Sequence, residues 1–174
     1  MCGHIVRFQL EGPFVFSFRI APVPLLLIYV SEVGVRFSIT EYALQNAEAR
    51  PRRIAVAPDD TIYYTDYARG YLGHFDPATR KLEEWPSPGG SGSNPYGIAV
   101  TGDVVVWYSE SGVHPNTLVR FDPKAKTFSS TPIPSGGGVV RNMAATKDGK
   151  LYLACSGVNK VAIVEIRTKT DRRS

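Results

Sequence analysis

Cysteine and histidine are scarce in this sequence, with two and three copies respectively. Cys2 and Cys155 provide neither a disulfide framework nor the ligand spacing of a zinc site. No apolar run approaches the roughly 20 residues that span a bilayer, and the longest, Leu25 to Val30, follows two prolines. We therefore expect no membrane partner. No leader is visible, and the sequence favours neither an exported nor a cytoplasmic location.

An excess of charge is also lacking, because the net charge is +4 and residues 167–174 carry +3 of it. A basic chain end is usually solvated, so this tail predicts no nucleic-acid partner. The 174 residues fit one domain, and 43% apolar residues are enough to fill a core. The 16 glycines and 13 prolines indicate many turns.

The sequence does contain a repeat of about 44 residues. Two sets of landmarks keep this period, one in the first apolar stretch of each unit and one at the end of the second. They are Ile54, Ile98 and Met143, and Asp66, Glu110 and Cys155. Successive members of each set lie 44 and then 45 positions apart, so chance is a poor explanation.

Each unit is typical of short strands. Runs such as Val104–Tyr108 are rich in β-formers and are bounded by turn residues. Asp76–Thr79 and Asp122–Ala125 fit type I turns with proline at the second position, and residues 81–85 and 127–131 then supply a fourth strand. Four short antiparallel strands in each period are typical of a β-propeller blade.

We therefore predict an all-β fold, a β-propeller with about three four-stranded blades in an open arc. The blades occupy about 45–88, 89–134 and 135–166, after an irregular partial blade over 1–44 and before a basic tail over 167–174. Closed rings typically have about 4 to 8 blades, so the ring is incomplete. Bare apolar faces at its ends favour self-association.

The N-terminal region repeats the pattern only in part. Residues 3–8, 28–32, 35–37 and 40–42 are similar to strands of the later units, but at shortened spacing. The region is interpreted as a compressed or damaged blade.

Several motifs resemble those of the virginiamycin B lyase (streptogramin lyase) family. They are Pro95–Ala99, Trp107–Glu110, Asn116–Pro123 and Thr40–Leu44, and the resemblance covers about residues 40–166. It implies a seven-bladed propeller with a pocket at one mouth of the central channel. It also implies an enzyme that opens a cyclic depsipeptide ester by elimination, with Mg²⁺ as cofactor. Gluconolactonase-like and NHL-repeat propellers share weaker versions of the blade.

The family's catalytic histidines follow the proline that opens the inner strand. The matching positions here are Arg52, Tyr96 and Arg141, and arginine stays protonated near neutral pH. The family's acidic metal contact corresponds to Arg50 or Asn94. Catalytic residues are therefore unassigned. Beside the lyase activity stand two alternatives, a non-catalytic propeller that binds a ligand or a protein and a lactonase-like, metal-dependent hydrolase.

Four residues open inner strands and are predicted to line one channel mouth: Arg52, Tyr96, Arg141 and Asn142. Arginine and tyrosine there can hold an anionic or aromatic small molecule through bidentate hydrogen bonds or stacking. The alternative is that these side chains cap their strands and cover the linker.

Asp66 and Glu110 end second strands, where carboxylates are candidate Mg²⁺ ligands. Their recurrence favours the alternative, a hydrogen bond to a neighbouring blade or a turn amide. Cys155 breaks the acidic series and is expected to be a small buried residue. His74 is expected on a third strand, at the surface.

Overall fold

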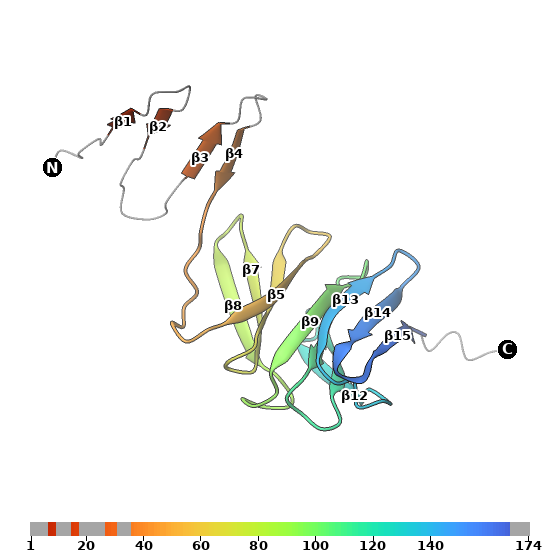
Figure 1. Cartoon of the computed structure of the whole chain (residues 1–174). Coiled ribbons are helices and arrows are strands. Elements are labelled where there is room, and N and C mark those ends of the chain that lie inside the picture. Colours follow the sequence, from red (N-terminus) through yellow and green to blue (C-terminus); the bar gives the residue numbers. More distant parts are fainter. Residues whose placement is uncertain (1–6, 10–14, 18–26, 31–35, 168–174) are drawn as a thin grey trace. The chain divides into compact units, whose positions relative to one another are not determined.

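The computed structural model describes residues 7–9, 15–17, 27–30 and 36–167 (Figure 1). The chain forms two compact units, Met1–Gln45 and Asn46–Ser174. Regular structure in the described residues is β, apart from the short 3-10 helix η1 (Ser156–Val158). None of these residues belongs to a helix long and apolar enough to cross a membrane.

The second unit contains three antiparallel sheets whose strands pair in chain order. The first blade consists of β5 (Pro51–Val56), β6 (Ile62–Asp66), β7 (Tyr71–Asp76) and β8 (Lys81–Pro86). The second blade consists of β9 (Pro95–Val100), β10 (Val106–Glu110), β11 (Thr117–Asp122) and β12 (Thr127–Pro132). The third blade consists of β13 (Val140–Ala145), β14 (Lys150–Cys155) and β15 (Lys160–Glu165). The expected fourth strand is absent from the third blade in the part of the chain that the structure describes.

The first strands β5, β9 and β13 lie side by side (Figure 1). The sheets pack through two apolar cores. One core joins the first and second blades around Leu72, Tyr108 and Phe121. The other joins the second and third blades around Leu118 and Leu151. The second blade therefore buries both of its faces, as expected of a propeller blade.

The two Asp-Pro turns connect third and fourth strands as the sequence predicts. Each aspartate, Asp76 or Asp122, accepts hydrogen bonds from the amides two and three residues later. The turns close at Arg80 and Lys126, whose φ angles are 60° and 53°. Side-chain acceptors of this kind replace backbone partners in a tight turn.

The first unit contains two hairpins. They pair β1 (Arg7–Gln9) with β2 (Val15–Ser17) and β3 (Leu27–Val30) with β4 (Arg36–Ile39). The prediction of a strand over 40–42 is wrong, because residues 40–44 have no regular structure. Most of the strand expected over 3–8 and most of the basic tail lie outside the described residues.

Candidate functional site

Every first strand carries a β-bulge near its start. In the first blade Pro51 pairs with Asp66 but Arg53 pairs with Thr65, so Arg52 is the extra residue. The second and third blades shift register at the equivalent point. A bulge re-aims side chains and recurs next to binding sites. Three bulges at one end of adjacent strands therefore alter which side chains face the channel mouth.

Six residues lie at this end, and we name them the arginine–tyrosine mouth. Five contribute side chains, namely Arg52, Arg53, Tyr67, Tyr96 and Asn142, and the sixth, the exposed Arg141, contributes its backbone carbonyl. Four were predicted from the sequence, whereas Arg53 and Tyr67 were missed. Strand alternation assigns Arg53 to the face opposite Arg52, and the sequence contains no signal for the bulge that places both at the mouth.

Arg53 connects the first and third blades across the start of the second. Its Nε donates to the carbonyl oxygen of Arg141 at 3.0 Å and to Oδ1 of Asn142 at 3.2 Å. Its guanidinium lies over the ring of Tyr96, 5.4 Å from the centroid. The predicted residues Tyr96, Arg141 and Asn142 are thus brought together by an arginine that the sequence did not single out.

Arg52 lies over the ring of Tyr67, with its guanidinium carbon 4.9 Å from the centroid. The rings of Tyr67 and Tyr96 meet edge to face at 5.5 Å. Arg52, Arg53 and Arg141 are exposed, and no ion pair joins any of them to a carboxylate within the described residues. The mouth therefore presents three uncompensated positive charges next to two aromatic rings.

Two buried hydroxyls fix the mouth strands to one another. Thr65 Oγ1 donates to the carbonyl of Tyr96 in the second blade at 2.8 Å. Ser109 Oγ donates to the carbonyl of Val140 in the third blade at 2.9 Å and accepts the Gly97 amide at 3.0 Å. The equivalent residue in the third blade is Ala154, which has no hydroxyl. We call Thr65 and Ser109 the joint hydroxyls.

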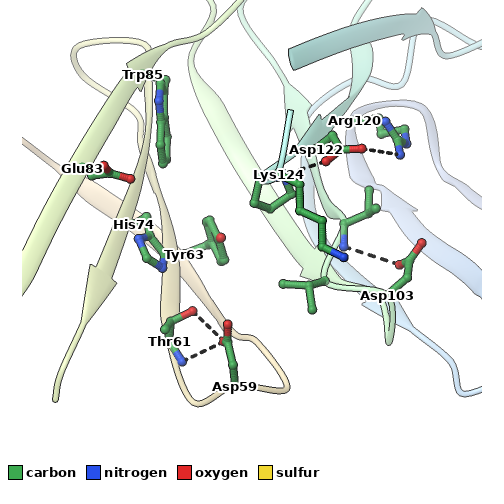
Figure 2. A pocket seen from close by; sticks show the side chains of 13 residues that line it. Asp59, Thr61, Tyr63, His74, Glu83, Trp85, Asp103, Arg120, Asp122 and Lys124 are labelled. Carbon is green, nitrogen blue, oxygen red and sulfur yellow. Dashed lines mark hydrogen bonds and ion pairs between the residues drawn. The ribbon is translucent and has the colours of Figure 1, made fainter. Parts of the chain in front are cut away.

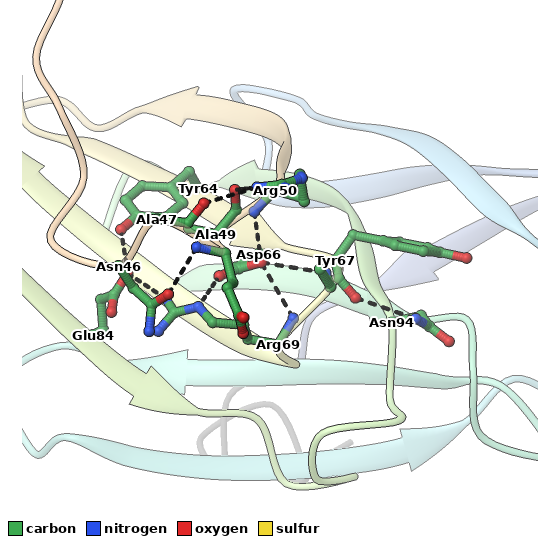
Figure 3. A network of polar contacts seen from close by, with 12 residues as sticks. Asn46, Ala47, Ala49, Arg50, Tyr64, Asp66, Tyr67, Arg69, Glu84 and Asn94 are labelled. Carbon is green, nitrogen blue, oxygen red and sulfur yellow. Dashed lines mark hydrogen bonds and ion pairs between the residues drawn. The ribbon is translucent and has the colours of Figure 1, made fainter.

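Asp66, a predicted metal ligand, is buried in the network of Figure 3. Its carboxylate accepts the amides of Arg50, Ala68 and Arg69, and it pairs with Nε of Arg69 at 2.6 Å. Arg69 also pairs with Glu84 at 2.6 Å, which raises the pKa of the Arg69 guanidinium. The Asp66 carboxylate thus holds the segment that enters the first blade.

Glu110, the other predicted metal ligand, is 1% exposed and holds the linker that enters the second blade. Its Oε1 accepts the Ser87 hydroxyl at 2.6 Å and the Gly89 amide at 2.7 Å, and its Oε2 accepts the Thr117 hydroxyl at 2.6 Å. Because the Ser87 proton is used on Glu110, the Tyr108 hydroxyl donates to Ser87. Burial raises the pKa of Tyr108 and keeps it protonated as that donor.

The residues present do not fit the magnesium ion that the family resemblance implies. No group of three or more acidic, histidine or cysteine side chains converges among the described residues. The Asp66 and Glu110 carboxylates already accept hydrogen bonds from amides and hydroxyls on separate linkers. Mg²⁺ prefers several oxygen ligands in near-octahedral geometry, which neither site assembles. We derive no step through a metal.

Two single-residue predictions have different outcomes. Cys155 is fully buried, as expected, and burial raises the pKa of its thiol. His74 lies on the third strand β7 as expected, but it is half-buried instead of fully at the surface. Its ring packs 4.6 Å from that of Tyr63 and 6.5 Å from that of Trp85. The reason is that these two aromatic rings of the first blade cover it.

The fold and the mouth define the class: this chain is an open segment of a β-propeller. No family model and no curated sequence matches it. Several solved structures, however, are similar to this chain. Virginiamycin B lyase from Staphylococcus aureus aligns over 95% of this chain, with 14% sequence identity and a TM-score of 0.59. A streptogramin B lyase aligns over 94% of this chain, with 19% sequence identity and a TM-score of 0.60. A Bacteroides uniformis protein provisionally assigned as a 6-phosphogluconolactonase aligns over 97% of this chain, with 17% sequence identity and a TM-score of 0.61.

These likenesses confirm the propeller fold and, at the level of fold, the resemblance that the motifs indicated. The chain covers 64%, 54% and 52% of those three structures, so it spans between about half and just under two thirds of their length. Identity below one fifth carries no information on which residues react.

Proposed function

We propose that this chain is the ligand-binding arc of a propeller and holds a small anion with an aromatic part at the arginine–tyrosine mouth. The observation that carries the proposal is the set of three exposed arginines without a carboxylate partner in the described residues, two on β5 and one on β13, on either side of β9. Guanidinium forks bind carboxylate or phosphate in bidentate geometry, and tyrosine faces accept a planar ring.

Chemistry supports binding at this mouth more than catalysis. An elimination requires a base, and the positions at which the resemblance expects histidines hold Arg52, Tyr96 and Arg141. A permanently protonated guanidinium removes no proton near neutral pH, but it stabilises an anion. Arg53 adds a fourth polar group whose Nε is already directed by Asn142 and the Arg141 carbonyl.

Binding is tested by titrating the protein with phenyl phosphate, with inorganic phosphate and benzyl alcohol as probes of each half. We expect phenyl phosphate to bind most tightly and its affinity to fall with added salt. Arg53→Gln and Arg141→Gln should each weaken binding about tenfold, as expected for one charge-assisted contact. The matched control is Arg80→Gln, an exposed turn arginine of the first blade. Equal losses in all three variants, or none, would contradict the proposal.

A second candidate is the lyase activity of the streptogramin-lyase structures, with catalytic groups supplied by blades outside this arc. Elimination at the ester breaks the C–O bond, removes the proton on the neighbouring carbon and leaves an alkene and a carboxylic acid. The product is an isomer of the substrate, whereas hydrolysis, the lactonase-like candidate, adds one water. Incubation with a type B streptogramin and Mg²⁺, followed by chromatography and mass spectrometry, separates the three outcomes. An unaltered substrate shows that this arc by itself catalyses neither reaction.

A further inference from the structure

A cleft of about 460 Å³ lies between the first and second blades (Figure 2). It is bordered by the turns that follow β5 and β9, around Asp59 and Asp103. The arginine–tyrosine mouth lies at the starts of these same strands, so the cleft is at the opposite end. Its volume is within the roughly 300–1,000 Å³ typical of small-molecule sites.

One wall of the cleft is aromatic and belongs to the first blade. It consists of Tyr63 on β6, His74 on β7 and Trp85 on β8. Tyr63 is 4% exposed, and Figure 2 shows it beside the cleft. Burial raises the pKa of Tyr63 to about 12 and lowers that of His74, so both are neutral near pH 7. The wall therefore offers donors and apolar ring surface without a positive charge.

Carboxylates surround this wall. Hydrogen bonds from the Thr61 hydroxyl and from the Lys81 ammonium lower the pKa of Asp59 and of Glu83 respectively. On the second blade Asp103 accepts the Thr101 hydroxyl at 2.5 Å, and Asp122 accepts the amides of its turn. Each carboxylate has local partners but keeps lone pairs, because an ionised carboxylate accepts about four hydrogen bonds.

The charge arrangement disfavours a cationic ligand. Lys126 already lies over the Trp85 ring, with Nζ 5.7 Å from the centroid. The same Nζ pairs with Glu83 at 3.3 Å, and Lys81 pairs with Glu83 at 3.2 Å. Lys126 therefore already supplies a cation to the Trp85 ring and to Glu83, and a ligand cation would be repelled by it. An anion would meet four carboxylates lining the cleft against two cations, Lys124 and Arg120, and Arg120 already pairs with Asp122 at 3.4 Å.

We propose that this inter-blade cleft binds a neutral, polyhydroxylated ligand of the sugar class. A sugar ring has apolar C–H faces, which fit the Tyr63–Trp85 wall, and hydroxyls that both donate and accept. Its hydroxyls donate to the carboxylates of Asp103 and Asp59 and accept from the Tyr63 hydroxyl. This site is independent of the mouth and of its anionic ligand.

The two tryptophans of the chain make a direct test. Trp107 packs on the opposite face of the second blade, where its Nε1 donates to the Thr101 hydroxyl. In proton–nitrogen correlation spectra, Trp107→Phe assigns the two indole N–H signals. We expect cellobiose to shift the Trp85 signal saturably, with a Kd on the order of 1 mM, and to shift the Trp107 signal less, because Trp107 reaches the cleft only through Thr101 and Asp103. The Trp107 signal also reports that each variant is folded.

Two variants and one further probe sharpen the result. Tyr63→Phe keeps the ring and removes only the hydroxyl, so we expect cellobiose to bind about tenfold more weakly. The matched control Tyr152→Phe, on the exposed face of the third blade, should bind as the wild type does. The proposal is overturned if cellobiose shifts neither signal, if both signals shift alike, if Tyr63→Phe binds unchanged, or if tetramethylammonium shifts the Trp85 signal and cellobiose does not.

Discussion

The first two blades and the third blade differ at the two residues that end the second strand. These are Thr65–Asp66 and Ser109–Glu110 in the first two blades but Ala154–Cys155 in the third. Thr65 and Ser109 are fully buried, and each donates to the first strand of the next blade. Ala154 is exposed and lies on the face that has no neighbouring sheet in the second unit.

The acidic position differs in the same way. Asp66 and Glu110 accept amides from the segments that enter their blades. In the third blade, where Cys155 takes the place of the carboxylate, the entering segment is held instead by the Ser156 hydroxyl, which donates to the Val139 carbonyl at 2.6 Å. The hydroxyls therefore occur at both blade-to-blade contacts that the structure describes, and the carboxylates that follow them hold the segments entering their own blades; we call each such pair a joint. The joint positions Tyr96 and Val140, which are at the mouth or next to it.

The largest expected effect comes from breaking the carboxylate half of the joint. Glu110→Ala leaves the Ser87 and Thr117 hydroxyls and the Gly89 amide without their acceptor. We expect it to lower the free energy of unfolding by about 3 kcal/mol, measured by urea denaturation. Glu48→Ala, an exposed control, should change it by less than about 0.5 kcal/mol. Similar changes in the free energy of unfolding for the two variants would show that the Glu110 hydrogen bonds do not stabilise the fold.

Removing a joint hydroxyl should have a smaller effect. Ser109→Ala deletes one donor and one acceptor at a fully buried position, so we expect a loss of about 1–2 kcal/mol. The reverse change in the third blade, Ala154→Ser, adds a hydroxyl with no neighbouring carbonyl on a described sheet and should be neutral. A gain of stability in Ala154→Ser would show that the hydroxyl acts without an adjoining blade.

A weaker, pH-dependent difference separates the first two blades, because His74 occupies the position of Arg120. Burial lowers the pKa of His74 below 6.5, so the unfolded chain takes up the proton more readily. The contribution is therefore present above pH 6.5 and lost as the pH falls below it. We expect His74→Gln to flatten the stability profile between about pH 5 and 7. A profile of stability against pH identical to that of the wild type would show that His74 does not cause this pH dependence.

The smallest effect on folding is expected at the exposed face of the third blade. Val161 and Ile163 are 77% and 60% exposed, so Ile163→Lys should change stability by less than about 0.5 kcal/mol. We propose that this face mediates self-association. Light scattering should then give a mass above that of one chain for the wild type and a lower mass for Ile163→Lys. A monomeric wild type would contradict the proposal.

Much of the fold follows from the repeat, because strand ends are fixed by local residue chemistry. The fourth strands expected over 81–85 and 127–131 are observed as Lys81–Pro86 and Thr127–Pro132. The predicted mouth residues are also at one end of adjacent strands. Their grouping depends on Arg53, whose direction is set by a β-bulge. No residue pattern in the sequence predicts that bulge.

The inter-blade cleft is a second feature that the sequence does not predict. The sequence placed His74 on the correct strand. The opposite side of the cleft, however, is formed by residues of the next blade, among them Asp103 and Asp122. Such a site depends on how two sheets pack, which a repeat period does not specify. Residues 40–42 show the converse error, since a strand-like motif there forms no strand.

Amide hydrogen exchange at Gly97 is the measurement that tests the joint most directly. The Gly97 amide donates to Ser109 Oγ inside the contact between the second and third blades. We predict slow exchange in the wild type and fast exchange in Ser109→Ala, while the amide of Val106 stays protected. Fast exchange at Gly97 in the wild type, or protection that survives the loss of the hydroxyl, would contradict it.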